Sequence, residues 1–111
     1  MGKKMFLVFT SPTKGNEEEF HRWYDEQHIP DVLKVPGVAT AQRFKVQPEE
    51  GSEESPPRYL VVYELNSDDL DQIFATMGAR FGTDEMPNSP ALDDSSVKML
   101  VVEAVGPKVE A

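Results

Sequence analysis

His28 is the side chain of this sequence best suited to moving a proton near neutral pH, because the ordinary pKa of an imidazole is about 6.5. It precedes Pro30 by two residues, and a helix that begins at Glu17 is expected to end or kink near His28. At helical spacing, Phe20, Trp23, Tyr24 and Gln27 fall on one stripe that we expect to be buried, and His28 lies at its edge. We therefore predict that His28 acts as a general acid or base. The alternative is an imidazole that only caps the carbonyls of the last helical turn.

Arg43 and Glu64 form a second candidate pair, because we expect them on adjacent antiparallel strands and their parity permits the same sheet face. Arg43 would then hold a substrate carboxylate, carbonyl or phenolate, with Glu64 orienting it or serving as a base. A plain cross-strand ion pair, worth under about 1 kcal/mol, is an equally good interpretation. The phenols that could donate a proton to a developing oxyanion are Tyr24, Tyr59 and Tyr63, although each is also a typical core residue.

His21, Asp25 and His28 follow one another at i, i+4 and i+7, which would place two imidazoles and a carboxylate along one flank of a helix. Zn²⁺, Fe²⁺ or Ni²⁺ could use such a set. One helix rarely supplies all three ligands, however, and this flank is expected to face away from the core. We therefore predict a solvated helix face and no metal site.

Apolar side chains at helical spacing predict a packed core, and they would also suit the walls of a pocket between helices and sheet. Gly78 costs a helix about 1 kcal/mol relative to alanine, so it is expected to make room for a helix crossing or a ligand. Residues 83–96 form a long loop that would be either a lid or slack chain. The predicted substrate-binding residues are Trp23, Tyr24, Glu64, Phe74, Met77 and Phe81.

Several common chemistries have no support in the sequence. The chain has no cysteine, which removes disulfides, thiolate nucleophiles and Cys-ligated zinc. It has no Gly-rich phosphate loop, no Gly-x-Ser-x-Gly elbow and no His-Glu-x-x-His motif. We therefore predict that no cofactor is required.

The elements that must position these groups follow one another as β-α-β-β-α-β in a single domain over residues 1–111. Helices are expected to begin after Asn16, with Glu19 in the capping-box position, and after Ser67-Asp68-Asp69. Residues 48–57 are predicted to be an exposed connection. The order is typical of the ferredoxin-like fold, an antiparallel four-stranded sheet with two helices on one face. The predicted strands cover residues 5–10, 38–47, 59–65 and 97–105.

The strands are apolar on both faces, whereas a sheet with one wet face should alternate apolar with polar residues. Tyr59 through Tyr63 is unbroken, and Met99 through Val102 is apolar throughout. Exposing about a dozen such side chains would cost on the order of 10 kcal/mol. We therefore predict a homodimer that packs sheet on sheet.

Charge limits the partners. The chain carries 20 Asp+Glu against 11 Lys+Arg, a net charge of −9, and it shows no basic patch, so we predict no nucleic-acid or membrane partner. The apolar run over residues 5–9 is shorter than a signal-peptide core, which favours a cytoplasmic protein. The acids fall mostly on helices and loops, which leaves room for an anionic small molecule at the sheet.

A resemblance to a known family adds to these interpretations. The residues that carry it are Phe20-His21-Arg22-Trp23-Tyr24-Asp25-Glu26-Gln27-His28-Ile29-Pro30, then Val35-Pro36-Gly37-Val38, then Arg43-Phe44. They resemble the EthD-like branch of the dimeric α/β-barrel superfamily. The resemblance implies a dimer with a cavity beside each sheet, and often a reactive histidine at the end of the first helix, a position that only His28 matches. Members of the superfamily include polyketide cyclases, quinone-forming oxygenases, lactone isomerases and haem enzymes.

From these observations we predict a small, cofactor-independent enzyme that acts on an apolar, aromatic or polyketide-like molecule. His28 would move the proton, Tyr63 or Tyr24 would hydrogen-bond the enolate or phenolate, and Arg43 would hold a carbonyl or carboxylate. Cyclase, isomerase, lyase and cofactorless oxygenase reactions all fit this set. The alternative is a non-catalytic or stress-associated barrel that binds a hydrophobic ligand. A haem-binding barrel is a third hypothesis, with His28 or His21 as a weak candidate ligand.

Overall fold

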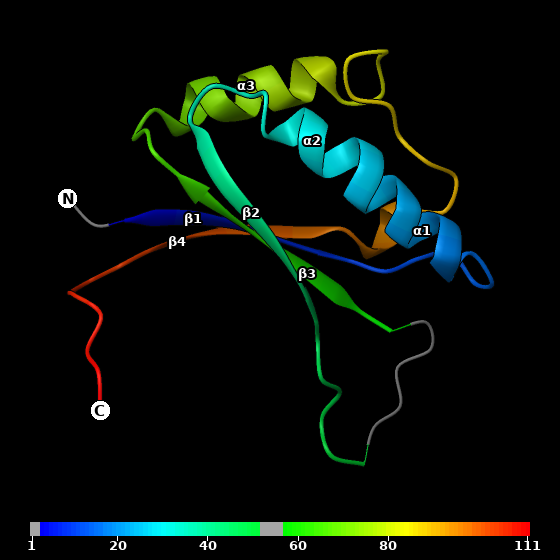
Figure 1. Ribbon diagram of the computed structural model, residues 1–111, viewed down its shortest axis with the longest axis horizontal. Helices are drawn as coiled ribbons and strands as arrows, with labels where there is room; N and C mark the ends of the chain where they lie inside the picture. The colour runs from blue at the N-terminus through cyan, green and yellow to red at the C-terminus, as the bar shows by residue number, and fades with distance from the viewer. Residues whose placement is uncertain (1–2, 52–56) are drawn as a thin grey trace.

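The computed structural model describes residues 3–51 and 57–111. Four strands form one antiparallel sheet in the order β2-β3-β1-β4, and the helices cover one face of it (Figure 1). This is the predicted ferredoxin-like arrangement, so the predicted fold class is confirmed. In chain order the elements are β1 (Lys4–Thr10), α1 (Glu17–Trp23), η1 (Tyr24–His28), α2 (Ile29–Val32), β2 (Val38–Lys45), β3 (Tyr59–Leu65), α3 (Leu70–Arg80), η2 (Asp94–Ser96) and β4 (Lys98–Glu103).

The first helix passes through Pro30 without breaking. Regular α-helix ends at Trp23, the π-helical segment η1 follows, and α2 adds a further turn. Proline has no amide hydrogen, and its ring would crowd the carbonyl of Glu26 in a regular α-helix. A π turn is wider, so it accommodates the ring while the chain keeps its direction. The regular helix therefore ends five residues before His28, earlier than the sequence indicated.

The start of α1 is where predicted, but its capping is different. Asn16 occupies the N-cap position with a backbone outside the extended region, and its side chain makes no cap hydrogen bond. Instead, its amide Nδ2 donates to Thr13 Oγ1 at 2.8 Å. Glu19 pairs with Arg22 at 3.0 Å rather than completing a capping box. At α3 the prediction is confirmed, because the Asp69 carboxylate accepts the Gln72 amide.

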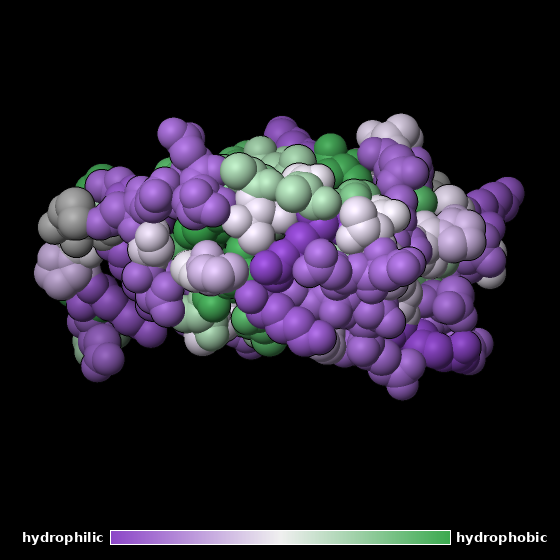
Figure 2. Space-filling view, turned by 90° about the horizontal axis from the view of Figure 1, so that it is seen from above, coloured by the Kyte–Doolittle hydropathy of each residue, from purple (hydrophilic) through white to green (hydrophobic). Residues whose placement is uncertain are grey.

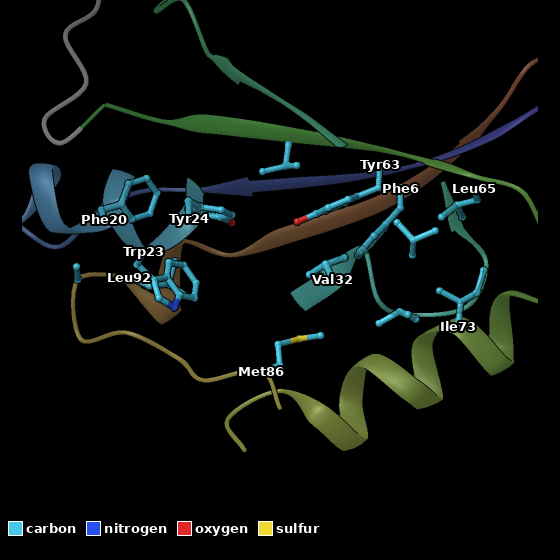
Figure 3. Close-up of a cluster of buried hydrophobic side chains, with 14 residues drawn as sticks. Phe6, Phe20, Trp23, Tyr24, Val32, Tyr63, Leu65, Ile73, Met86 and Leu92 are labelled. Carbon is cyan, nitrogen blue, oxygen red and sulfur yellow. The ribbon is translucent and has the colours of Figure 1, made fainter. Parts of the chain in front are cut away.

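The apolar core fills the space between the helices and one face of the sheet (Figure 3). On the helix-facing side of β1 and β3, Phe6, Val61, Tyr63 and Leu65 are buried, and Val8 and Tyr59 are partly buried. Phe20, Trp23 and Tyr24 complete the aromatic stripe of the first helix and are buried as predicted, whereas Gln27 is exposed. Of the predicted connection over residues 48–57, positions 52–56 lie outside the described residues, and the neighbouring residues 48–51 are exposed.

Gly37 brings the turn before β2 into close contact with α3. Its φ is +99°, and an added Cβ would lie 2.8 Å from the Cδ1 atom of the buried Ile73. Gly37→Ala is therefore expected to lower the free energy of unfolding by about 2 kcal/mol, because the backbone strain adds to the crowding of Ile73.

Gly15→Ala is the matched control for this prediction. Gly15 also has a positive φ, +82°, but nothing lies within 4 Å of an added Cβ. Its loss should be limited to backbone strain, about 1 kcal/mol. Urea unfolding of the two variants beside the unmodified chain makes the comparison, and equal losses would contradict a role for the contact with Ile73.

Hydrophilic side chains cover most of the molecule when it is seen from the helix side (Figure 2). Apolar side chains are visible between them. Acidic side chains of the helices, such as Glu17, Glu18 and Asp71, are exposed. The excess of negative charge therefore lies in contact with solvent. No helix among the described residues is long and apolar enough to cross a membrane.

Candidate functional site

A cavity of about 630 Å³ lies between the helix-facing side of the sheet and the helices. Its walls are almost entirely apolar and aromatic, which is typical of small-molecule sites. The sheet contributes Phe6, Val8, Thr10, Tyr63, Met99, Leu100 and Val101. The helices contribute Trp23, Tyr24, His28, Val32, Phe74, Met77, Gly78 and, just after α3, Phe81, and the following loop contributes Met86, Leu92, Asp94 and Val97.

His28 lines this cavity inside a box of aromatic rings. Its imidazole stacks on Trp23, with ring centroids 4.6 Å apart, and meets Tyr24 and Phe81 edge to face. The side-chain atom Nδ1 is buried and has no hydrogen-bond partner. Burial lowers the pKa of His28 to about 4, although the nearby Asp31 carboxylate acts in the opposite direction. The imidazole is therefore neutral at pH 7 and can accept a proton.

Two phenols, Tyr24 and Tyr63, line the same cavity as His28, and Tyr24 is in ring contact with it. Tyr24 receives a hydrogen bond from Thr10 Oγ1 at 3.3 Å, which leaves its own hydroxyl hydrogen available. Tyr63 is 1% exposed, and Figure 3 shows its oxygen directed toward Tyr24. Burial raises the pKa of both phenols, most strongly that of Tyr63. Both therefore stay protonated at neutral pH and can donate hydrogen bonds.

Arg43 does not line the cavity. Its guanidinium lies over the ring of Tyr24, 4.7 Å from the centroid, and holds Asp25 and His21 at 3.0 Å each. It therefore acts on Tyr24 from outside the cavity, as a cation stacked on the aromatic ring. The predicted role of Arg43, holding a substrate carboxylate, carbonyl or phenolate, stays a prediction, and Arg43 is not among the residues that line this cavity.

Glu64 lies on the opposite face of the sheet, so the expectation that it shares a face with Arg43 is wrong. A β-bulge between Val38 and Thr40 shifts the register of β2 against β3. After the bulge, Arg43 is paired with Val61 on the helix-facing side, and Thr40 is paired with Glu64 on the other. Glu64 accepts a hydrogen bond from Thr40 and forms a salt bridge with Lys3. It is not part of the cavity.

The other predicted substrate-binding residues, Trp23, Tyr24, Phe74, Met77 and Phe81, all line the cavity. Their role in binding remains a prediction. His21 and His28, in contrast, are separated: His21 contacts Tyr59 and Arg43, whereas His28 faces the cavity. Within residues 3–51 and 57–111, no group of three His, Cys, Asp or Glu side chains is placed to hold a metal ion.

The loop after α3 is a wall of the cavity rather than slack chain. Met86 and Leu92 are buried, and the Trp23 indole Nε1 donates to the Pro87 carbonyl at 3.0 Å. Thr13 N also donates to the Ala91 carbonyl at 2.7 Å. Sequence reasoning left this loop as either a lid or slack chain, and it did not assign Thr10 or Asp94 to the site. The buried apolar pair Ala91 and Leu92 among acids was the only signal that could have indicated it.

The fold and the cavity together define a ferredoxin-like domain with an apolar small-molecule pocket beside its sheet. A protein-family model, described as a domain of unknown function (DUF4286), matches residues 4–86, and the chain belongs to that family. No curated protein matches the sequence.

Three solved structures share the fold at low sequence identity, and each match includes 99% of the chain of the solved structure. An EthD family protein from Bacillus halodurans has a TM-score of 0.59, 16% identity and 92% coverage of this chain. MhuD, crystallised as a mutant with two manganese protoporphyrin IX per active site, has a TM-score of 0.60, 20% identity and 96% coverage. A putative antibiotic biosynthesis monooxygenase from Bacillus cereus has a TM-score of 0.57, 10% identity and 100% coverage. The expected resemblance to EthD-like proteins is thereby confirmed in the fold.

A porphyrin fits this cavity poorly. Neutral His28 is a suitable kind of axial ligand, but no Lys or Arg is among the lining residues to pair with two propionates. The one acid in the lining, Asp94, would repel them. The described lining therefore does not fit a haem.

Proposed function

We propose that this protein is a small enzyme that binds an apolar, aromatic or polyketide-like molecule in the cavity and removes a proton from it with His28. The observation that carries the proposal is the His28 imidazole, stacked on Trp23 in an apolar cavity that two buried phenols, Tyr24 and Tyr63, also line. A base and oxyanion donors in one apolar cavity are what proton abstraction next to a carbonyl or phenol requires.

In this proton transfer, His28 and the two tyrosines of the cavity have different roles. His28 takes the proton of the carbon acid or phenol, and the hydroxyls of Tyr24 and Tyr63 stabilise the enolate or phenolate that forms. The guanidinium of Arg43 behind the Tyr24 ring makes that phenol a better donor. Aldol-type cyclisation, isomerisation, lyase chemistry and oxygenation of an activated phenol all begin with this step.

A second candidate function is binding without catalysis. A pKa of about 4 makes His28 a weak base, and the apolar walls alone would suffice to sequester a hydrophobic metabolite. Under this hypothesis a molecule that co-purifies with the protein stays unchanged on incubation.

We propose further that two copies of the chain pack sheet on sheet. The uncovered face of the sheet carries Leu7, Phe9, Leu60 and Val62, and Phe44 at its edge is 42% exposed. An apolar face of this extent is typical of an interface. Sedimentation is expected to give twice the chain mass of 12.4 kDa, and a stable monomer at micromolar concentration would contradict the dimer.

The experiment that tests the function fills the cavity from α3. Gly78 lines the cavity, and nothing lies within 4 Å of an added Cβ, so Gly78→Leu is expected to occupy the ligand space while the helix gains stability. Native mass spectrometry should then find less co-purified ligand, and conversion of a found substrate should fall at least tenfold.

Ala79→Leu is the matched control, because Ala79 is exposed on the same helix and does not line the cavity. It should retain both ligand and turnover. Unchanged turnover in Gly78→Leu would contradict the assignment of this cavity, whereas retained binding without any conversion in the unmodified chain would support the second candidate function.

A further inference from the structure

The charged groups that line the cavity limit which ligands it can bind. Among the described residues that line it, Asp94 is the one Asp, Glu, Lys or Arg. The His28 imidazole, which also lines the cavity, is neutral at pH 7 and adds no positive charge. An anion placed among the apolar walls would lose its hydration without meeting a cation. The lining therefore disfavours a carboxylate ligand.

Asp94 stands at the rim. It is the first residue of η2, it is exposed to solvent and it still lines the cavity. One carboxylate oxygen accepts a hydrogen bond from Asn88 Nδ2 at 3.3 Å, which fixes the side chain from the loop side. In the part of the chain that the structure describes, no Lys or Arg forms a salt bridge with it. Its negative charge is thus available to a ligand.

Arg43, which lies over the ring of Tyr24, does not add a positive charge to the lining. It holds the Asp25 carboxylate and the His21 ring, and it is not among the residues that line the cavity. Aromatic walls also favour a cation over an anion, because the ring faces carry negative partial charge. The Asp94 carboxylate at the rim and the aromatic walls therefore both favour a cationic ligand over an anionic one.

We propose that Asp94 makes the cavity select an aromatic ligand bearing an ammonium group at the rim over the carboxylate of the same shape. This specificity deepens the proposed function, since it rests on the cavity being the ligand site. It replaces the sequence-based expectation of an anionic molecule held at the sheet by Arg43. The ammonium would lie at Asp94 while the flat ring system extends inward toward Trp23 and His28.

The test uses three probes of one shape: 2-naphthylmethylammonium, 2-naphthylmethanol and 2-naphthoate. Trp23 is the only tryptophan of the chain and lines the cavity, so quenching of its fluorescence reports binding. At pH 7 and low salt, the ammonium probe is expected to bind roughly tenfold more tightly than the carboxylate, with the alcohol between them. Asp94→Asn should bring the three affinities together, and Asp94→Lys should reverse their order.

Asp84→Asn is the matched control, because Asp84 is an exposed acid of the same loop outside the cavity lining. It changes the net charge by the same amount as Asp94→Asn and should leave the order of affinities intact. Equal affinities in the unmodified chain, tighter binding of the carboxylate, or the same selectivity in Asp94→Asn would each overturn the proposal. Absence of binding by all three probes would overturn it together with the ligand site. Intact selectivity without turnover of any substrate would refute only the catalytic function.

Discussion

His28→Ala is expected to lower the turnover of a bound substrate by about 10²- to 10⁴-fold, the usual contribution of a positioned general base. No other imidazole lines the cavity, and Tyr24 and Tyr63 remain protonated at neutral pH, so none of these groups replaces His28 as the base. Ligand affinity should change far less, because the walls stay in place. Turnover of His28→Ala within a few-fold of the unmodified chain would contradict the proposed mechanism.

The same assignment fixes the pH dependence of the reaction. The pKa of His28 is about 4, and the proton acceptor is the neutral form. Activity should therefore rise as the pH rises through about 4 and then stay level through neutrality, whereas a general acid would show the opposite trend. His21→Ala serves as the control, since His21 lies outside the cavity lining and should leave this profile unchanged.

The fold was predictable because local patterns and the tertiary structure agree. The run over residues 59–65 is β-branched and aromatic, it coincides with β3, and its odd-numbered residues Val61, Tyr63 and Leu65 are buried. Periodicity likewise places Phe74 and Met77 of α3 against the sheet. The hydrophobic pattern of the sequence was therefore sufficient to predict β3 and α3.

Two local irregularities were not predictable in the same way, and both change the site. The bulge in β2 separates Arg43 from Glu64, although strict alternation permits them to meet. The π-helical segment before Pro30 changes the angular position of His28 relative to His21, so that the two imidazoles do not lie along the one solvated flank that regular helical spacing indicates. The bulge shifts the alternation of side chains in β2 by one residue, and the π-helical segment shifts the rotation of the helix by a fraction of a turn. Predictions from periodicity assume a constant period, so they miss both shifts.

The cavity itself depends on contacts that are distant in sequence. Asp94 and Leu92 reach the site only because the loop over residues 83–96 folds back on β1 and α1 through the bonds of Thr13 and Trp23. Neither periodicity nor capping rules describe such a loop, since its course is set by tertiary packing. Trp23, Phe74 and Met77, which lie on helices, were therefore predicted from the sequence, whereas Asp94, which sets the charge of the rim, was not.

A second large effect is expected on stability at acid pH. In the unfolded chain the pKa of His28 returns to its ordinary value of 6.5, whereas in the folded chain it is about 4. Between these values the unfolded state binds a proton that the folded state does not, so stability falls as the pH falls through this interval. The difference of pKa corresponds to a loss of about 3 kcal/mol, complete near pH 4 and absent above pH 6.5.

His28→Phe isolates this contribution, because it keeps an aromatic ring against Trp23 and removes the titrating nitrogen atoms. Carboxyl groups also titrate below pH 6, so the quantity to compare is the difference between the two proteins in urea unfolding at pH 7 and pH 4.5. The variant should lose less stability on acidification than the unmodified chain, by about 2–3 kcal/mol. His21→Phe should show a smaller change of the same sign, because burial also lowers the pKa of the more exposed His21. Parallel stability curves for the unmodified chain and His28→Phe would mean that the pKa of His28 is the same in the folded and the unfolded chain, and the desolvation of its imidazole in the aromatic box would then be wrong.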